Sequence, residues 1–326
     1  MKADKRSIRI IIVISAFLVP LLFAENTSKT REPIVAGTFY PARPKKLREE
    51  VRNLLDQSIK KYHRRDIDKG PCGLIVPHAG YRFSGRTAAG AFSLLERHRK
   101  PSRILLIGPS HHFHMDGLIS VAPYSHHKTP LGKLRVDEKA RNALLKSKMV
   151  VSRATVHARE HSLEVELPFI QVLWNNPPPI LPIIVGTLKE KEIKSLAKLF
   201  NKVIDDKTLI VASSDFTHYG KRFGFAPYEN SSGKDLAKKI EALDRGAIQY
   251  IEKLDSAGFL QYCHKTGATI CGRMAIALQL AILRKQNRNI KHLSLEYASS
   301  AAVLGNRSNS VSYYAHAFIP VEDKTK

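Results

Sequence analysis

The sequence predicts an α/β protein in which a mainly parallel central sheet is flanked by helices on both faces. Short apolar runs alternate with amphipathic helical stretches along most of the 326 residues, the order expected when parallel strands are joined by crossover helices. The apolar runs are continuous, as in strands that are buried on both faces. No internal repeat or low-complexity linker interrupts the pattern, so residues 31–326 are expected to form a single domain.

The expected elements begin with an extended segment at residues 31–42 (REPIVAGTFYPA). A charged helix follows at residues 44–65, and Pro44 suits its first turn because the missing N–H costs nothing there. Further strands are expected at residues 73–76, 103–108, 180–185, 208–212, 293–298 and 310–319. Further helices are expected at residues 85–97, 136–148, 162–174, 189–205, 233–252 and 271–284. The last strand, SVSYYAHAFI, alternates in polarity, which predicts an edge strand or an antiparallel addition to the sheet.

The first residues have the layout of a secretory signal peptide. Basic residues precede an apolar run at residues 10–24, and polar residues resume after Ala24. The run is short for a spanning helix, which needs about 20 apolar residues. Residues 1–24 are therefore predicted to direct export to the periplasm or the extracellular space and to be removed. A short uncleaved membrane anchor is the alternative, and it would be the only contact with a membrane.

The chain is strongly basic, with a net charge of +24. Basic proteins can bind nucleic acid, but here the excess is spread along the sequence, and no recognisable nucleic-acid motif accompanies it. We therefore expect a solvated basic surface and no nucleic-acid partner. The three cysteines, Cys72, Cys263 and Cys271, are too few and odd in number for a disulfide framework.

Histidines follow three of the predicted strands. His78, His111 and His218 each lie just beyond the carboxyl end of a different strand. Because ligands of open α/β sheets bind outside these ends, the three imidazoles are expected to meet at one edge, as ligands of iron, copper or zinc must. Asp215 is expected to orient one histidine through its second ring nitrogen.

Cys271 lies where a predicted apolar helix begins, in the run ATICGR. A helix N-terminus stabilises a thiolate, so we expect a lowered thiol pKa, and the thiolate is the form that binds metal or attacks a substrate. Cys72 and Cys263 are expected to be structural. A metal-free nucleophile arrangement of Cys271, His218 and Asp215 remains open. Phosphate-cradling glycine motifs and the G-x-S-x-G elbow are absent from the sequence.

The other histidines have simpler interpretations. His112, beside His111, is expected to pack or to support a ligand. His157 and His161 flank Glu160 where a helix is predicted to begin, which is as typical of a helix cap as of a ligand pair. Solvated side chains are expected for the histidines of one polar stretch, His114, His126 and His127.

A series of longer runs is PHAGYRFSG (77–85), GPSHH (108–112), TPLGKLRVD (129–137), EHSLEVELPF (160–169), PIIVG (182–186), SSDFTHYG (213–220), LD with LDS (243–244 and 254–256) and ICGR (270–273). Together they resemble the Memo (mediator of cell motility) family, also called protein B of the AmmeMemoRadiSam system. The resemblance extends from Arg31 to Ile319.

The resemblance implies a fold similar to that of the class III extradiol dioxygenases. It also implies a metal site formed by His78, His111 and Cys271, with Asp215 and His218 beside it. Iron or copper is the implied metal. Two histidines and a carboxylate suit Fe(II), whereas a thiolate is softer and also suits copper(I). Three functions remain open: an oxidoreductase acting on a small aromatic substrate, a non-catalytic metal- or peptide-binding module, and a metal-free Cys–His hydrolase.

Overall fold

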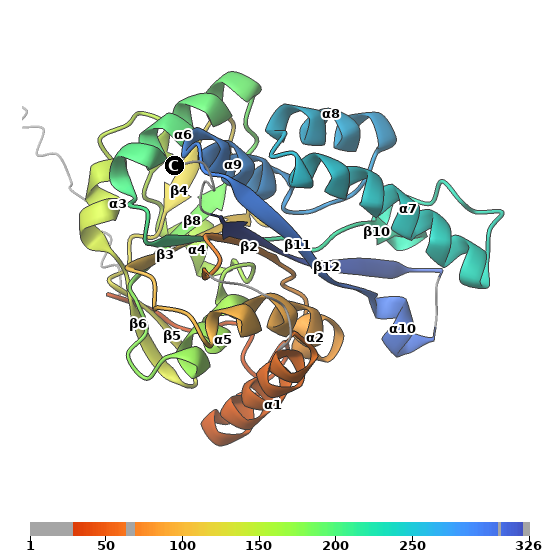
Figure 1. Cartoon of the computed structure of the whole chain (residues 1–326), viewed down its shortest axis with the longest axis horizontal. Helices are drawn as coiled ribbons and strands as arrows, with labels where there is room; N and C mark the ends of the chain where they lie inside the picture. Colours follow the sequence, from red (N-terminus) through yellow and green to blue (C-terminus); the bar gives the residue numbers. More distant parts are fainter. Residues whose placement is uncertain (1–28, 63–68, 306–307, 322–326) are drawn as a thin grey trace, which may run out of the picture.

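The computed structural model describes residues 29–62, 69–305 and 308–321. They form a central sheet with helices on both faces (Figure 1). The predicted leader at residues 1–24 and the end of the predicted first helix at residues 63–65 lie outside the described residues. No helix within the described part of the chain is long and apolar enough to cross a membrane.

Four parallel strands form the centre of the sheet. Their order is β2 (Gly73–Val76), β9 (Thr208–Ser213), β3 (Arg103–Pro109) and β8 (Ile180–Val185). All four were predicted within one residue of these bounds, because each is a continuous apolar run that is buried throughout or nearly so.

The sheet as a whole is mixed, which corrects the prediction of a mainly parallel sheet. Strand β12 (Ser310–Pro320) runs antiparallel to β2, and β11 (Ile290–Ser299) runs antiparallel to β12 on its other side. The alternating run at residues 310–319 is thus an antiparallel addition, as predicted, but it is an interior strand, and β11 lies outside it. The sheet is completed by short strands that the sequence did not predict, β4 (Ile119–Val121), β7 (Val150–Val151) and β10 (His218–Tyr219).

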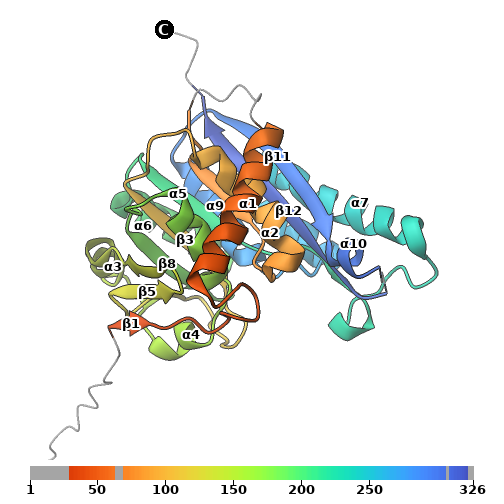
Figure 2. The ribbon, with the colours of Figure 1, turned by 90° about the horizontal axis from the view of Figure 1, so that it is seen from below.

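Alternate residues of the central strands enter two separate cores. Ile75, Leu105 and Ile210 face one core, and their neighbours Leu74 and Val211 face the other. The first core is covered by α6 (Glu190–Val203), α7 (Gly233–Glu252), α8 (Ser256–Thr266) and α9 (Arg273–Lys285). The second is covered by α1 (Pro44–Tyr62), α2 (Tyr81–Phe92) and α5 (Leu167–Leu173), with α1 and α2 in front of β11 and β12 in Figure 2.

Several predicted helices have different bounds in the structure. Helix α2 begins at Tyr81 rather than residue 85, because the Gly80 carbonyl already accepts from the backbone N–H groups of Phe83 and Ser84. The predicted helix at 162–174 is a 3-10 turn at Glu164–Glu166 followed by α5. The predicted helix at 136–148 is shortened to α3 (Glu138–Leu144).

A small second sheet and two short helices were also missed. Strands β1 (Thr30–Arg31), β5 (His126–Thr129) and β6 (Gly132–Arg135) form this sheet, and the short helices are α4 (Ala154–Ala158) and α10 (Ser300–Leu304). The prediction that His127 is solvated is therefore wrong. Its side chain lies on the inner face of β5 and is only 2% exposed.

Candidate metal centre

The parallel strands place three loops at the same edge of the sheet. Strands β2 and β3 lie on either side of β9, so the segments that follow them leave the sheet together. His78 follows β2, His111 follows β3 and Asp215 follows β9, each two residues after the strand ends. Cys271 reaches this edge from the segment before α9. The topology therefore gathers residues that are far apart in the sequence.

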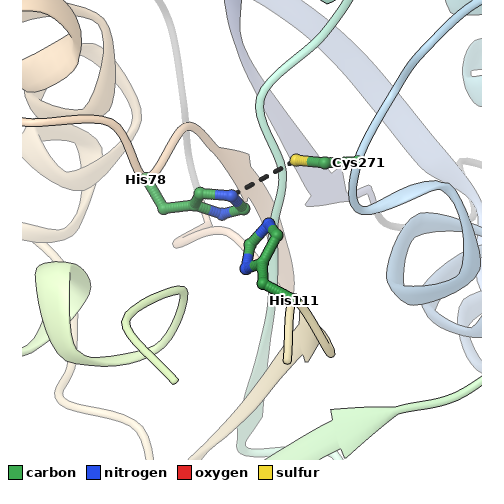
Figure 3. Close-up of side chains that lie close together, drawn as sticks. All are labelled: His78, His111 and Cys271. Carbon is green, nitrogen blue, oxygen red and sulfur yellow. Dashed lines mark hydrogen bonds between the residues drawn. The ribbon is translucent and has the colours of Figure 1, made fainter. Parts of the chain in front are cut away.

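His78, His111 and Cys271 point toward one another (Figure 3). The Nε2 atom of His78 lies 3.2 Å from the Sγ atom of Cys271. The rings of His78 and His111 meet edge to face, with their centroids 5.2 Å apart. One donor atom from each of the three residues lies within 4.8 Å of the other two. His78 is buried, Cys271 is half-buried and His111 is exposed, so the group is accessible from the His111 side.

Glu160 fixes the orientation of His111. One carboxylate oxygen lies 2.9 Å from His111 Nδ1, and the other accepts from the His111 backbone N–H at 2.7 Å. Burial alone would raise the pKa of Glu160, but the contacts with His111 outweigh it and hold that pKa below its usual range. With Nδ1 held by the carboxylate, the Nε2 atom of His111 is left for another partner.

His161 stacks on His111, with ring centroids 4.7 Å apart. Burial, with His111 nearby, lowers the pKa of His161 to about 4. Donor atoms of His111, Glu160 and His161 also lie within 4.8 Å of one another. In the sequence, Glu160 and His161 are as typical of a helix cap as of a ligand pair. The sequence signal that could have singled them out is the acidic Glu160 flanked by two histidines, His157 and His161.

Asp215 and His218 lie beside the group, and within the described residues no hydrogen bond joins them to each other. The Asp215 carboxylate accepts from the backbone N–H of His78 at 2.9 Å, and burial raises the pKa of Asp215 to about 7. His218 Nδ1 lies 2.9 Å from the Phe216 carbonyl and 3.1 Å from the Thr269 carbonyl. No hydrogen bond within the described chain joins His218 to Asp215 or Cys271. The predicted role of Asp215 in orienting a histidine ring is therefore replaced by a contact with the His78 main chain.

The Cys271 thiol does not have the lowered pKa that was predicted. Burial raises the pKa of Cys271, and the nearby Asp215 carboxylate raises it further. The physical reason is that α9 begins at Arg273, so Cys271 precedes the first turn, and its sulfur lies against the His78 ring and the Asp215 carbonyl instead. The other two cysteines are buried and form no disulfide; Cys72 lies just before β2 and Cys263 lies inside α8.

Asp244 of α7 anchors the segment that leads into β10 and His218. One oxygen of this fully buried carboxyl accepts from the hydroxyl of Thr217 at 2.6 Å, and the other accepts from the Tyr297 hydroxyl at 2.7 Å. Burial outweighs these hydrogen bonds and raises the pKa of Asp244 from 3.8 to about 6.

This raised pKa predicts a pH-dependent stability difference between the wild type and Asp244→Asn. The folded protein holds the Asp244 proton more tightly than the unfolded protein does. The stabilisation that the protonated carboxyl adds is therefore complete below about pH 4 and is lost as the pH rises through about 6. It amounts to at most about 3 kcal/mol, and an amide does not titrate. Denaturant unfolding of both proteins from pH 4 to pH 7 would measure it. A constant difference between them would contradict the prediction.

Comparison with known proteins places these residues in a family. A family profile described as Memo-like protein matches residues 31–317. Protein MEMO1 of Homo sapiens is 36% identical over 307 residues, which cover 90% of this chain and 98% of the relative. A MEMO1 family protein of Methanopyrus kandleri is 30% identical over 295 residues, covering 88% of this chain and 98% of the relative. A memo-1 homolog of Caenorhabditis elegans is 33% identical, covering 87% and 81% respectively.

Proposed function

The chain belongs to the Memo-like protein family, and from that premise we propose that it is a metal-binding protein whose centre is formed by His78, His111 and Cys271. The observation that carries the proposal is the convergence of two imidazoles and one thiol, from three separate segments, within 4.8 Å. Ligands that share one ion at about 2.0–2.3 Å must lie about 3–4 Å apart. The 3.2 Å between His78 Nε2 and Cys271 Sγ is already within that range.

The donor set fits iron or copper. Imidazole suits both metals, and a thiolate adds preference for a soft ion such as copper(I). Either ion would supply one-electron redox chemistry, so we propose a metal-dependent oxidoreductase related to the extradiol dioxygenases. Here Glu160 would hold the His111 ring in place, and Asp215 would hold the main chain of His78.

A small aromatic substrate is consistent with the surroundings of the centre. His111 lies on the exposed side, and the neighbouring Phe113 is 40% exposed. Phe39 meets the ring of His161 edge to face, with centroids 5.0 Å apart. These rings would offer edge and face contacts to a planar ligand approaching from the His111 side.

A metal-free hydrolase has less support than a metal site. That function needs a histidine that is oriented by a carboxylate and lies beside the thiol. The histidine beside Cys271 is His78, and its second nitrogen faces a serine rather than Asp215. A non-catalytic metal- or peptide-binding module shares the same site, and turnover alone separates it from an oxidoreductase.

The experiment that tests the proposal is metal analysis of the purified protein, followed by oxygen-uptake assays with catechols. Bound iron or copper at about one ion per chain supports the metal centre, and oxygen uptake supports the oxidoreductase. Metal without uptake for any catechol favours the binding module. Protein that neither contains nor takes up either metal would contradict the proposal.

We also expect His78→Ala and His218→Ala to differ in metal affinity. Removing a ligand should cost more than removing a residue beside the centre, for which the loss is at most about 10–100-fold. Titration of the metal-free variants with Fe(II) and copper(I) compares them directly. If His218→Ala weakened binding as much as His78→Ala, then His218 would itself be a ligand.

A further inference from the structure

The His78 ring is held from behind by a buried chain of polar groups. On the side away from Cys271, His78 Nδ1 lies 2.8 Å from the hydroxyl oxygen of Ser213. That hydroxyl lies 2.6 Å from the Ser162 carbonyl and 3.0 Å from a carboxyl oxygen of Glu166. His78 is 2% exposed, and Ser213 and Glu166 are completely buried. The chain Cys271–His78–Ser213–Glu166 therefore leads from the centre into the core.

The hydrogens of this chain can be assigned by counting donors and acceptors. His78 Nε2 faces the Cys271 sulfur, and there it would offer its lone pair to a metal, or to the thiol hydrogen when that hydrogen is not donated to the Asp215 carbonyl, 3.6 Å from the sulfur. The ring proton is then on Nδ1 and is donated to Ser213. A hydroxyl has only one hydrogen, and the Ser162 carbonyl, the shortest contact, can only accept. The single hydrogen of Ser213 is therefore used there.

This count leaves the contact between Ser213 and Glu166 without a hydrogen if Glu166 is ionised. Two oxygen atoms 3.0 Å apart would then face each other with lone pairs only. A protonated Glu166 carboxyl supplies the missing hydrogen. The Ser213 oxygen then accepts from His78 and Glu166 and donates to Ser162, which uses its full hydrogen-bonding capacity.

The surroundings of Glu166 also favour the neutral acid. Its second carboxyl oxygen is buried and has no hydrogen-bond partner within the described chain. An ionised carboxylate buried without a partner is far more costly than a neutral acid. Burial raises the pKa of Glu166 well above its usual range. The hydrogen bond with Ser213 lowers this pKa in part, and the nearby Asp215 raises it further. Glu160 and Glu164 of the same segment differ, because each accepts several hydrogen bonds.

We propose that Glu166 is a neutral carboxylic acid and a positioning residue for the metal centre. Glu166 donates to the Ser213 oxygen, and Ser213 donates its own hydrogen to the Ser162 carbonyl. The Ser213 oxygen can therefore offer only a lone pair to His78. The ring of His78 is thereby held with its proton on Nδ1 and with a bare Nε2 toward Cys271. The protonation state of Glu166 follows from the hydrogen-bond count at Ser213. Its importance for metal binding rests on the proposed function.

The first test uses the metal-free protein and does not depend on metal binding. Nitrogen-15 NMR of the histidine side chains distinguishes a protonated ring nitrogen from a bare one. In the wild type we expect His78 to carry its proton on Nδ1. Glu166→Gln should retain this tautomer, because its amide N–H can replace the acid as donor, whereas Ser213→Ala should yield a mixture. A His78 proton on Nε2 in the wild type would overturn the proposal.

The protonation of Glu166 is tested separately by infrared spectroscopy at pH 7. The difference spectrum between the wild type and Glu166→Gln should contain the carbonyl band of a carboxylic acid. A carboxylate band in its place would show that Glu166 is ionised. This measurement depends mainly on the wild type and on an isosteric variant, so it does not require that more disruptive variants fold.

Metal titration then tests whether the hydrogen bonds behind His78 affect metal affinity. Glu166→Gln should bind metal within a few-fold of the wild type, whereas Ser213→Ala should lose about 10–100-fold, as expected for a group that orients a ligand. Melting curves of both variants are the control for folding. If the wild type binds no metal while the tautomer is as expected, the proposed function fails, and only the neutral state of Glu166 and its hold on the His78 ring stand. Equal affinity in folded Ser213→Ala and the wild type would remove the link to metal binding.

Discussion

Cys271→Ser is expected to lower the affinity for copper(I) by more than about 100-fold, and the affinity for Fe(II) by much less. Loss of a group that only orients a ligand costs about 10–100-fold, so loss of the ligand itself should exceed this range. The difference between the metals arises because a hydroxyl oxygen is a poor ligand for a soft ion. Competition titrations of the metal-free proteins with both ions, against a chelator of known affinity, would measure it.

Cys263→Ser is the matched control for this variant. Cys263 is a buried free thiol inside α8, and it belongs to neither cluster of potential ligands in the described chain. The Cys263→Ser variant should bind both metals as the wild type does. Equal losses for copper and iron in Cys271→Ser, or no loss for either, would mean that the sulfur is not a ligand. The Cys271–His78 pair would then have to be reconsidered as metal-free.

Glu164→Ala is expected to lower the free energy of unfolding by about 3–5 kcal/mol, because it breaks a buried ion pair from one side. Glu164 lies 2.7 Å from the Arg31 guanidinium, and both side chains are buried. It also accepts from the Tyr40 hydroxyl at 2.6 Å and from the backbone N–H groups of Ile34 and Val35. Alanine would leave the Arg31 charge and these donors without their acceptor. Denaturant unfolding at neutral pH measures the loss.

The control for this prediction is Glu190→Ala. Glu190 pairs with Lys194 on the exposed surface of α6, where ion pairs contribute little. The expected change is within about 0.5 kcal/mol. Replacing Arg31 and Glu164 together with apolar residues of similar size should recover the part of the loss that comes from the unpaired Arg31 charge, but not the part from the unpaired donors. A loss below about 1 kcal/mol in Glu164→Ala would mean that solvent or a neighbour replaces the carboxylate.

The elements that the sequence predicted well are those whose pattern is local. The central strands are continuous apolar runs, and α7 was predicted with its observed bounds from helical periodicity. The short strands β4, β5 and β7 were missed because two to four residues carry too little periodicity to be recognised. The position of β11 outside β12 was not predicted either, since it depends on pairing between strands.

The same distinction applies to the candidate centre. His78 and His111 were predicted from their positions after strands, which is a local pattern joined to a general rule. Cys271 was included through the family resemblance, since its contact with His78 joins residues 193 positions apart. Glu160 and Ser213 were missed because their roles depend on side-chain contacts with His111 and His78 across 49 and 135 positions. A local sequence pattern does not contain that information.

The short run from Glu160 to Glu166 contains three glutamates that are chemically different groups. The first is an anion against His111, the second is half of an ion pair with Arg31, and the third lacks any cation among its described partners. A scan that replaced each with alanine would therefore measure three unrelated effects: loss of the contact that orients His111, loss of the ion pair with Arg31, and loss of the hydrogen bond to Ser213 behind His78. The residue type does not reveal which effect a given substitution measures. The partner of each carboxyl group does.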